Sequence, residues 1–319
     1  MGTEQQRSTP PPAGFAALAL FLSVGWFVQS FDTSPPLTLF EAGSAVDGFP
    51  PIALLAARAT ITLLHAGALL HFTFGGCHAI VTDFYKRDLG SHLQEETVHV
   101  SGIERCATYF TVWTYAAQGI YFALATWASA AATGVVATAP PLRALHALFE
   151  LSTGCSLLVT IMITFVIWPD LVREGKDTGV VKNPQALLMH NVTVAEVLTE
   201  LVFGRVPLYP KHIPFALYWG AAYVVWTWFH APFLARNARS FGTSRGNGAN
   251  FAYFFLDYTL PQKTYGLFLV GLAVVLSVFY MVATGLQMAI GAFAARGVPL
   301  VPLAFMTYGC GFMITKWRD

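Results

Sequence analysis

The stretch MHNVTVAEVLTE, from Met189 to Glu200, decides how the whole chain is interpreted. It carries one histidine and two glutamates, yet it lies inside a segment, 184–204, that otherwise resembles a membrane helix. A charged side chain in the bilayer is costly unless it is paired or faces a wet cavity. If this stretch crosses the membrane, its polar side chains must therefore have partners inside the protein.

The composition is that of a polytopic membrane protein. Of the 319 residues, 55% are hydrophobic and 11% are charged, and the mean hydropathy is +0.56. Soluble domains carry about 25% charged residues. The net charge of +1 gives no electrostatic reason for binding nucleic acid. The four cysteines lack paired spacing, so we expect neither a disulfide framework nor a zinc site, and no metal or other cofactor.

Eight apolar segments are candidates for membrane helices, because a helix needs roughly 20 apolar residues to cross the hydrocarbon. The candidate spans are 15–31, 52–75, 107–133, 144–168, 184–204, 212–235, 266–292 and 298–315. The polar, proline-rich residues 1–14 are expected to form a disordered tail. We expect residues 15–319 to form a single transmembrane helical domain.

The basic residues of the loops test this topology, because they gather on one side of a membrane protein. If all eight segments cross, the other side receives only Arg143, Arg205, Lys211 and Arg296. Omitting 184–204 would place the basic residues of 236–263 opposite those of 86–105 and 173–182. The pattern therefore predicts that MHNVTVAEVLTE crosses, in an all-α polytopic bundle of about six to eight transmembrane helices with both termini on the same side.

Depth along the helices places four polar side chains in one layer. With a rise of about 1.5 Å per residue, Thr111 and His190 reach similar depths from the same face of the membrane. His71 and His230 arrive near this level from the opposite face. A threonine can also satisfy its own helix backbone, and a membrane histidine is often bonded across a helix interface. Both the catalytic and the structural interpretation remain open on these grounds.

A second layer of ionisable residues is expected near the opposite face. Arg58 and Glu150 each lie about six residues from that side, and Glu200 lies close to it. An ion pair between Arg58 and either Glu150 or Glu200 would neutralise the arginine. At 100° per residue, His190, Glu196 and Glu200 share one face of their helix, which we expect to point into the bundle. We assign Arg58, Glu150, Glu196 and Glu200 to a structural polar network.

Three stretches together resemble a known superfamily. YFTVWTYAAQGIYFAL, from Tyr109 to Leu124, has a threonine near the helix start and a glutamine seven residues later. HNVTVAEVLTEL, 190–201, begins with histidine and carries a glutamate ten residues later, and YFFLD spans Tyr253 to Asp257. Over roughly residues 52–292 the chain resembles the androgen-induced family of transmembrane lipid hydrolases and the related rolling-stone membrane proteins.

The resemblance implies an activity and assigns residues to it. Members of the androgen-induced family hydrolyse esters between a fatty acid and a hydroxy fatty acid, with a membrane threonine as nucleophile and a membrane histidine as base. By motif these roles fall on Thr111 and His190, and membrane lipids are the implied partners. A hydroxyl is a weak nucleophile until a neighbouring base accepts its proton. His71, Gln118 and His230 are the candidates to complete the substrate pocket.

Two other functions are consistent with the sequence. In the first, the protein is a non-catalytic membrane subunit of a larger complex, or a fusion or adhesion factor, whose polar groups contact other membrane protein subunits. In the second, it is a haem-binding electron carrier. Bis-histidine haem needs two histidines at matching depth on facing helices, and His71 with His190 or His230 is the candidate pair. All three readings predict a multi-pass integral membrane protein.

Overall fold

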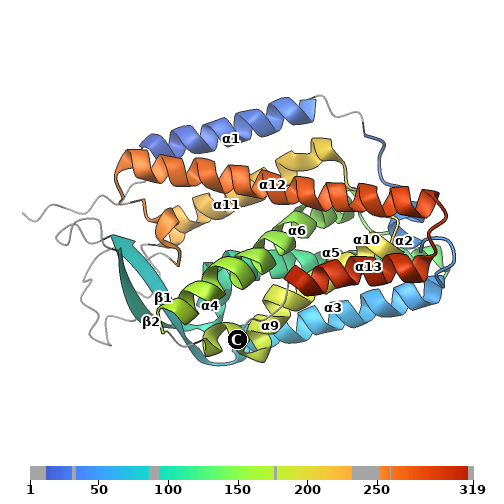
Figure 1. The fold of residues 1–319 in the computed structure, drawn as a ribbon, viewed down its shortest axis with the longest axis horizontal. Helices are drawn as coiled ribbons and strands as arrows, with labels where there is room; N and C mark the ends of the chain where they lie inside the picture. Colours follow the sequence, from blue (N-terminus) through green and yellow to red (C-terminus); the bar gives the residue numbers. More distant parts are fainter. Residues whose placement is uncertain are drawn as a thin grey trace, which may run out of the picture. The chain divides into compact units, whose positions relative to one another are not determined.

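The computed structural model describes residues 12–30, 34–85, 93–175, 178–231, 252–258 and 260–314. In chain order the elements are α1 (Pro12–Ser30), α2 (Leu39–Gly43), α3 (Pro51–Phe74), β1 (Cys77–Tyr85), β2 (Leu93–Ser101), α4 (Gly102–Thr108), α5 (Phe110–Ala132), α6 (Leu142–Met162), η2 (Ile163–Ile167), α7 (Trp168–Arg173), α8 (Gly179–Lys182), α9 (Pro184–Leu187), η3 (Leu188–Val192), α10 (Thr193–Phe203), η4 (Pro210–His212), α11 (Ile213–His230), η6 (Phe254–Leu256), α12 (Gln262–Ala295) and α13 (Leu300–Ile314) (Figure 1). The fold is all-α apart from one hairpin, as the sequence predicts.

Four helical segments of the described chain are long and apolar enough to cross a membrane: Pro51–Phe74, Leu142–Arg173, Pro184–Phe203 and Gln262–Ala295. The stretch MHNVTVAEVLTE, from Met189 to Glu200, lies in the third of these segments. Pro12–Trp26 and Leu300–Gly309 are shorter apolar helices. α5 and α11 also coincide with predicted spans, but their many tyrosine and tryptophan residues lower their hydropathy. The protein is an integral membrane protein built from helices.

The N-terminal boundary differs from the prediction. α1 begins at Pro12, so residues 12–14, which were expected to belong to the polar tail, are helical. Proline is favoured in the first turn of a helix, because its missing N–H has no partner there and its φ is already helical. The predicted location of both termini concerns residues 1–11 and 315–319, which lie outside the described residues.

The segment 76–106, expected to be a loop, contains a β-hairpin. β1 and β2 pair antiparallel, from Cys77 opposite Ser101 to Tyr85 opposite Leu93 (Figure 1). Valine, isoleucine and threonine are frequent in both strands, and these residues favour extended backbone. No strand was predicted here, because the apolar runs on both sides of the segment indicate helices. It is followed directly by α4, whose first turn is capped by the Ser101 side chain.

The chain forms two compact units. The first unit comprises Met1–Phe27, Leu69–Trp113 and Leu217–Val275, and the second comprises Val28–Ala68, Thr114–Ala216 and Leu276–Asp319. The core of the first unit is rich in aromatic residues, with Tyr223, Trp228 and Tyr265 buried together and the Trp228 indole donating to the Tyr265 hydroxyl over 2.6 Å. Tyrosine and tryptophan can be buried in this way because their polar ends find partners.

The second unit is organised around α6. Every residue of this helix from Phe149 to Thr160 is buried. Its small residues permit close contact with α12, since a Cβ at Gly154 would lie only 3.1 Å from the Cα of Tyr280. Small residues at helix contacts let backbones approach in membrane bundles, where lipid gives no hydrophobic drive for association. α13 packs along α10 on another side of the same unit.

Two wide helical turns interrupt the long helices of the second unit. The first, η2, ends just before Pro169, whose ring would clash with the carbonyl four residues earlier in a regular helix. The second, η3, contains His190. It follows α9, which starts at Pro184 and is capped by the Asn183 side chain. Wider turns of this kind occur frequently at functional sites.

Candidate functional site

Arg58 and Glu200 form a fully buried ion pair in the second unit. The guanidinium makes two parallel bonds, from Nε to Oε1 and from Nη2 to Oε2, each 2.7 Å long. Its third nitrogen, Nη1, donates to the Ala42 carbonyl and the Ser129 hydroxyl, both at 2.7 Å, and to the Ala125 carbonyl at 3.3 Å. Exposure is 0% for Arg58 and 1% for Glu200. Of the two partners expected for Arg58, Glu200 is the one observed.

Glu196 belongs to a second buried cluster, one helical turn before Glu200. Its Oε2 atom lies 2.8 Å from His65 Nε2 and accepts a hydrogen bond from the Gln118 amide, also at 2.8 Å. Ser156 donates to the other end of Gln118 at 2.5 Å. Gln118, a predicted pocket residue, thus connects α5, α6 and α10. The Oε1 atom of Glu196 has no hydrogen-bond partner among the described residues.

His65 is held with both ring nitrogens engaged. Its Nδ1 atom lies 3.0 Å from the Tyr115 carbonyl, which can only accept, so Nδ1 carries a proton. Its Nε2 atom then shares one further proton with Glu196. The ring also stacks on Tyr115 with centroids 3.9 Å apart. A histidine bonded in this way is not free to ligate a haem iron.

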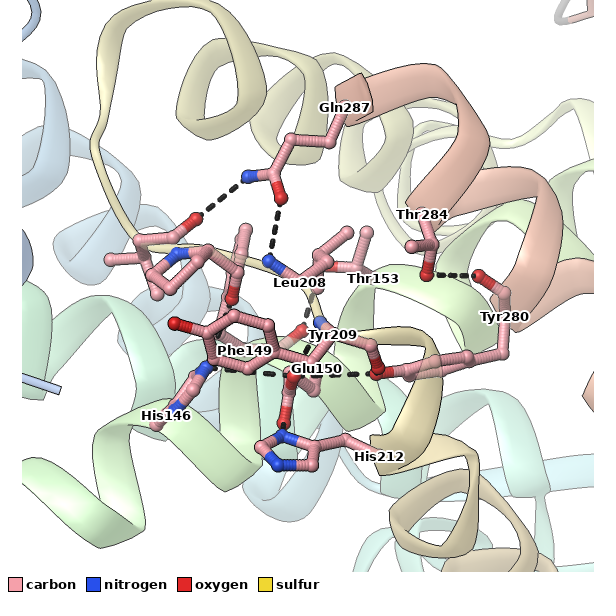
Figure 2. A network of polar contacts seen from close by, with 12 residues as sticks. His146, Phe149, Glu150, Thr153, Leu208, Tyr209, His212, Tyr280, Thr284 and Gln287 are labelled. Carbon is pink, nitrogen blue, oxygen red and sulfur yellow. Dashed lines mark hydrogen bonds and ion pairs between the residues drawn. The ribbon is translucent and has the colours of Figure 1, made fainter. Parts of the chain in front are cut away.

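Glu150 lies at the centre of a third cluster, which is separate from Arg58 (Figure 2). Its Oε2 atom is 2.5 Å from His212 Nδ1, and its Oε1 atom is 3.5 Å from His146 Nε2. Oε1 also accepts from the Tyr209 N–H at 3.0 Å and the Tyr280 hydroxyl at 3.3 Å. The carboxylate is 0% exposed. The Glu150 carboxylate therefore contacts two imidazole rings and two neutral hydrogen-bond donors.

Two elements supply the three residues of this cluster. His146 and Glu150 are one turn apart on α6, and His212 ends the short helix η4 that leads into α11. One ligand atom from each of the three residues lies within 4.8 Å of the other two, an arrangement that could hold a metal ion. Sequence reasoning assigned Glu150 to the Arg58 network and missed His212. Only the His-x-x-x-Glu spacing on α6 was visible in the sequence, because 62 residues separate Glu150 from His212.

His190 occupies the wide turn η3 of the second unit. Its Nδ1 atom is enclosed and has no hydrogen-bond partner among the described residues. Its backbone carbonyl accepts a hydrogen bond from the Thr160 hydroxyl of α6. The wide turn thus leaves one imidazole nitrogen without a protein partner while α6 anchors the backbone. A neutral imidazole nitrogen in this state can accept a proton.

Thr111 is the second residue of α5 and belongs to the first unit. The Tyr253 phenol lies near this helix start, where the Thr111 side chain and the backbone of Phe110 and Thr111 act to lower its pKa. Burial has the larger effect and raises the pKa of Tyr253 to about 12, so the phenol stays protonated at neutral pH. Tyr253 was not among the predicted site residues, although it begins the YFFLD motif.

The two remaining predicted pocket residues also lie in the first unit. His71 is exposed near the end of α3, with its ring 6.4 Å from that of Phe72. His230 is half-buried at the end of α11 and stacks on Trp226 with centroids 5.3 Å apart.

Comparison with known proteins adds no further assignment. No protein-family model, no curated protein and no solved structure matches this chain. The function therefore has to be inferred from the motifs and from the side-chain chemistry described above.

Proposed function

We propose that this integral membrane protein hydrolyses lipid esters within the bilayer, with Thr111 as nucleophile and His190 as general base. Esters between a fatty acid and a hydroxy fatty acid are the substrate class that the motif resemblance implies. The observation that carries the proposal is the proximity of the Tyr253 phenol to Thr111, which brings two of the three resembling motifs together at one helix start.

The position of Thr111 favours the chemistry of a nucleophile. It lies in the first turn of α5, where the helix dipole stabilises developing negative charge. The protonated Tyr253 hydroxyl beside it is a hydrogen-bond donor, and such donors stabilise the oxyanion that forms when an ester carbonyl is attacked. One protein group thus supplies the attacking oxygen, and its neighbour offers a donor for the resulting charge.

The state of His190 supports its role as the base. A general base needs a nitrogen lone pair that no other protein donor occupies, and Nδ1 of His190 has no such donor among the described residues. By contrast, both nitrogens of His65 are engaged. His190 would accept the Thr111 proton as the acyl-threonine forms and would return it to the departing hydroxy fatty acid. Water would then release the acyl group by the reverse proton path.

The test is covalent labelling by a fluorophosphonate probe, followed by hydrolysis of a fatty acid ester of a hydroxy fatty acid in detergent. The wild-type protein and Thr111→Ser should label and hydrolyse, whereas Thr111→Ala should do neither. Thr60→Ala is the matched control, because Thr60 is an exposed helix threonine whose hydroxyl bonds only its own backbone at Ala56. His190→Gln should slow both reactions by at least about a hundredfold.

Two results would refute the hydrolase. Labelling that persists in Thr111→Ala would place the reactive group elsewhere. Absence of labelling and hydrolysis in wild-type protein that elutes as one folded species would favour a non-catalytic membrane subunit. A Soret absorption band in the purified protein would instead indicate a haem carrier.

A further inference from the structure

We propose that His146, Glu150 and His212 bind one divalent transition-metal ion, for which zinc is the best match, at the junction of α6 with the segment 204–212. The site is independent of the proposed hydrolase and uses none of its residues. It is the one group of histidine, cysteine or acidic side chains in the described chain whose ligand atoms converge closely enough for a metal.

The donor set is that of a zinc site. Two imidazole nitrogens and one carboxylate form a common protein ligand set for zinc, with ligand bonds of about 2.0–2.2 Å. In tetrahedral geometry such bonds separate neighbouring ligand atoms by about 3.4 Å. The observed separations of 2.5 Å from His212 Nδ1 to Glu150 Oε2 and 3.5 Å from His146 Nε2 to Glu150 Oε1 lie on either side of that value. These two separations involve different oxygens of Glu150, and one ligand atom from each of the three residues lies within 4.8 Å of the other two.

A backbone carbonyl oxygen next to His146 is a possible fourth ligand. The Pro207 carbonyl oxygen is 2.9 Å from His146 Nε2. A carbonyl oxygen can bind a metal ion, so the oxygen of Pro207 could complete a four-coordinate shell with the three side chains. With four protein ligands the site would be closed, which is the character of a structural rather than a catalytic zinc site.

Groups around the cluster orient the carboxylate. Ligating carboxylates are usually held by further hydrogen bonds, which fix their direction. Here the Tyr209 N–H donates to Glu150 Oε1, and the single proton of the Tyr280 hydroxyl is shared between the Tyr209 carbonyl at 2.7 Å and Glu150 Oε1 at 3.3 Å. Glu150 is thereby fixed from α12 as well as from its own helix.

The segment that carries two of the donors is itself fixed by a glutamine. Gln287 of α12 accepts from the Leu208 N–H at 2.5 Å and donates to the Val206 carbonyl at 2.8 Å (Figure 2). Pro207 and His212 are therefore presented by backbone that does not depend on the metal for its course. A preformed backbone lowers the ordering cost of binding.

The three side chains of the cluster differ slightly in exposure. The Glu150 side chain is 0% exposed, whereas those of His146 and His212 each retain 10% exposure. The two imidazoles are thus slightly more exposed than the carboxylate, whose negative charge would partly neutralise a bound ion. Metal bound here would connect the N-terminal half of α6 to the start of α11 in the second unit.

The test is metal content and cobalt spectroscopy on the full-length protein, purified in detergent through a tag that binds no metal. After chelation and reloading with Zn²⁺ in small excess, the wild-type protein should retain about one zinc per chain through desalting. The Co²⁺ form should show the visible d–d bands of a four-coordinate ion. Glu150→Gln and His212→Gln should each weaken Zn²⁺ binding at least tenfold.

Glu196→Gln is the matched control. It removes another buried carboxylate that pairs with a histidine, in the same unit, but leaves the proposed ligands intact. It should retain zinc at the wild-type stoichiometry. Each variant is scored only as the fraction that elutes at the wild-type size.

His212→Cys keeps the test decisive if Glu150→Gln does not fold. A thiolate remains a zinc ligand, so this variant should bind Zn²⁺, and its Co²⁺ form should gain a sulfur-to-cobalt charge-transfer band. The proposal is overturned if folded wild-type protein retains no zinc, if Glu150→Gln binds zinc as tightly as wild type, or if Co²⁺-loaded His212→Cys lacks that band.

Discussion

Removing Glu200 should destabilise the protein severely, because it strands a buried guanidinium. Arg58 is fully buried and makes five hydrogen bonds. Two of these bonds go to the Glu200 carboxylate, which neutralises the guanidinium. Breaking a buried ion pair by removing one partner costs about 3–5 kcal/mol. Glu200→Leu and Arg58→Met should therefore each lower the free energy of unfolding by that amount.

The double variant should be far more stable than the two single losses suggest. Arg58→Met combined with Glu200→Leu removes both charges and leaves one main deficit, the Ala42 carbonyl, which loses its donor. A buried acceptor left without a partner costs about 1–3 kcal/mol. Ser129 keeps a partner in the Gly43 carbonyl. The coupling energy of the cycle should therefore be at least about 3 kcal/mol.

The assay is reversible unfolding in mixed micelles of increasing SDS content, followed by tryptophan fluorescence and circular dichroism. Arg143→Met is the control, because Arg143 is exposed at the start of α6, and it should change stability by less than about 0.5 kcal/mol. Additive single losses, or a Glu200→Leu variant within about 1 kcal/mol of wild type, would refute the conclusion that this pair is buried and mutually dependent.

Three further outcomes follow from the geometry. Gly43→Ala should destabilise the protein by about 1–3 kcal/mol in the same micelle assay, because its Cβ would lie 2.5 Å from the Ala128 carbonyl oxygen; unchanged stability would contradict this close contact. Gly271→Ala should be neutral or stabilising by up to about 1 kcal/mol, since it lies inside α12 with nothing within 4 Å of the new Cβ, and a clear loss would contradict that open environment. Tyr253→Phe should lower the kcat of ester hydrolysis by about 10²-fold with little change in KM, and an unaltered kcat would remove Tyr253 from oxyanion stabilisation.

Much of the helical fold was predictable because apolar runs of membrane length have few alternatives. The basic loop residues indicated that 184–204 crosses, and that segment is one of the four helices long and apolar enough to do so. The partner of Arg58 could be narrowed to two glutamates, but not to one. That choice depends on which side chain of the packed bundle meets the guanidinium, and helical depth alone cannot resolve it.

The site was harder to predict because its contacts join segments that are far apart in the chain. His212 ends the short helix η4 just before α11, and no pattern in the sequence connects it with Glu150. The wide turn around His190 was also invisible, since such turns have no characteristic residue pattern. Tyr253 was noticed only as part of a motif, and its proximity to Thr111 required the folded first unit.

The Arg58–Glu200 pair also constrains how the chain is made. The two residues are 142 positions apart, so α3 leaves the ribosome long before the carboxylate that neutralises it exists. An arginine opposes insertion of a membrane helix, by about 2.5–3.5 kcal/mol at the helix centre and by less toward its ends. α3 therefore gains its neutralising partner only after α10 has been made. A chain truncated before Glu200 would carry an unpaired arginine in an early membrane helix.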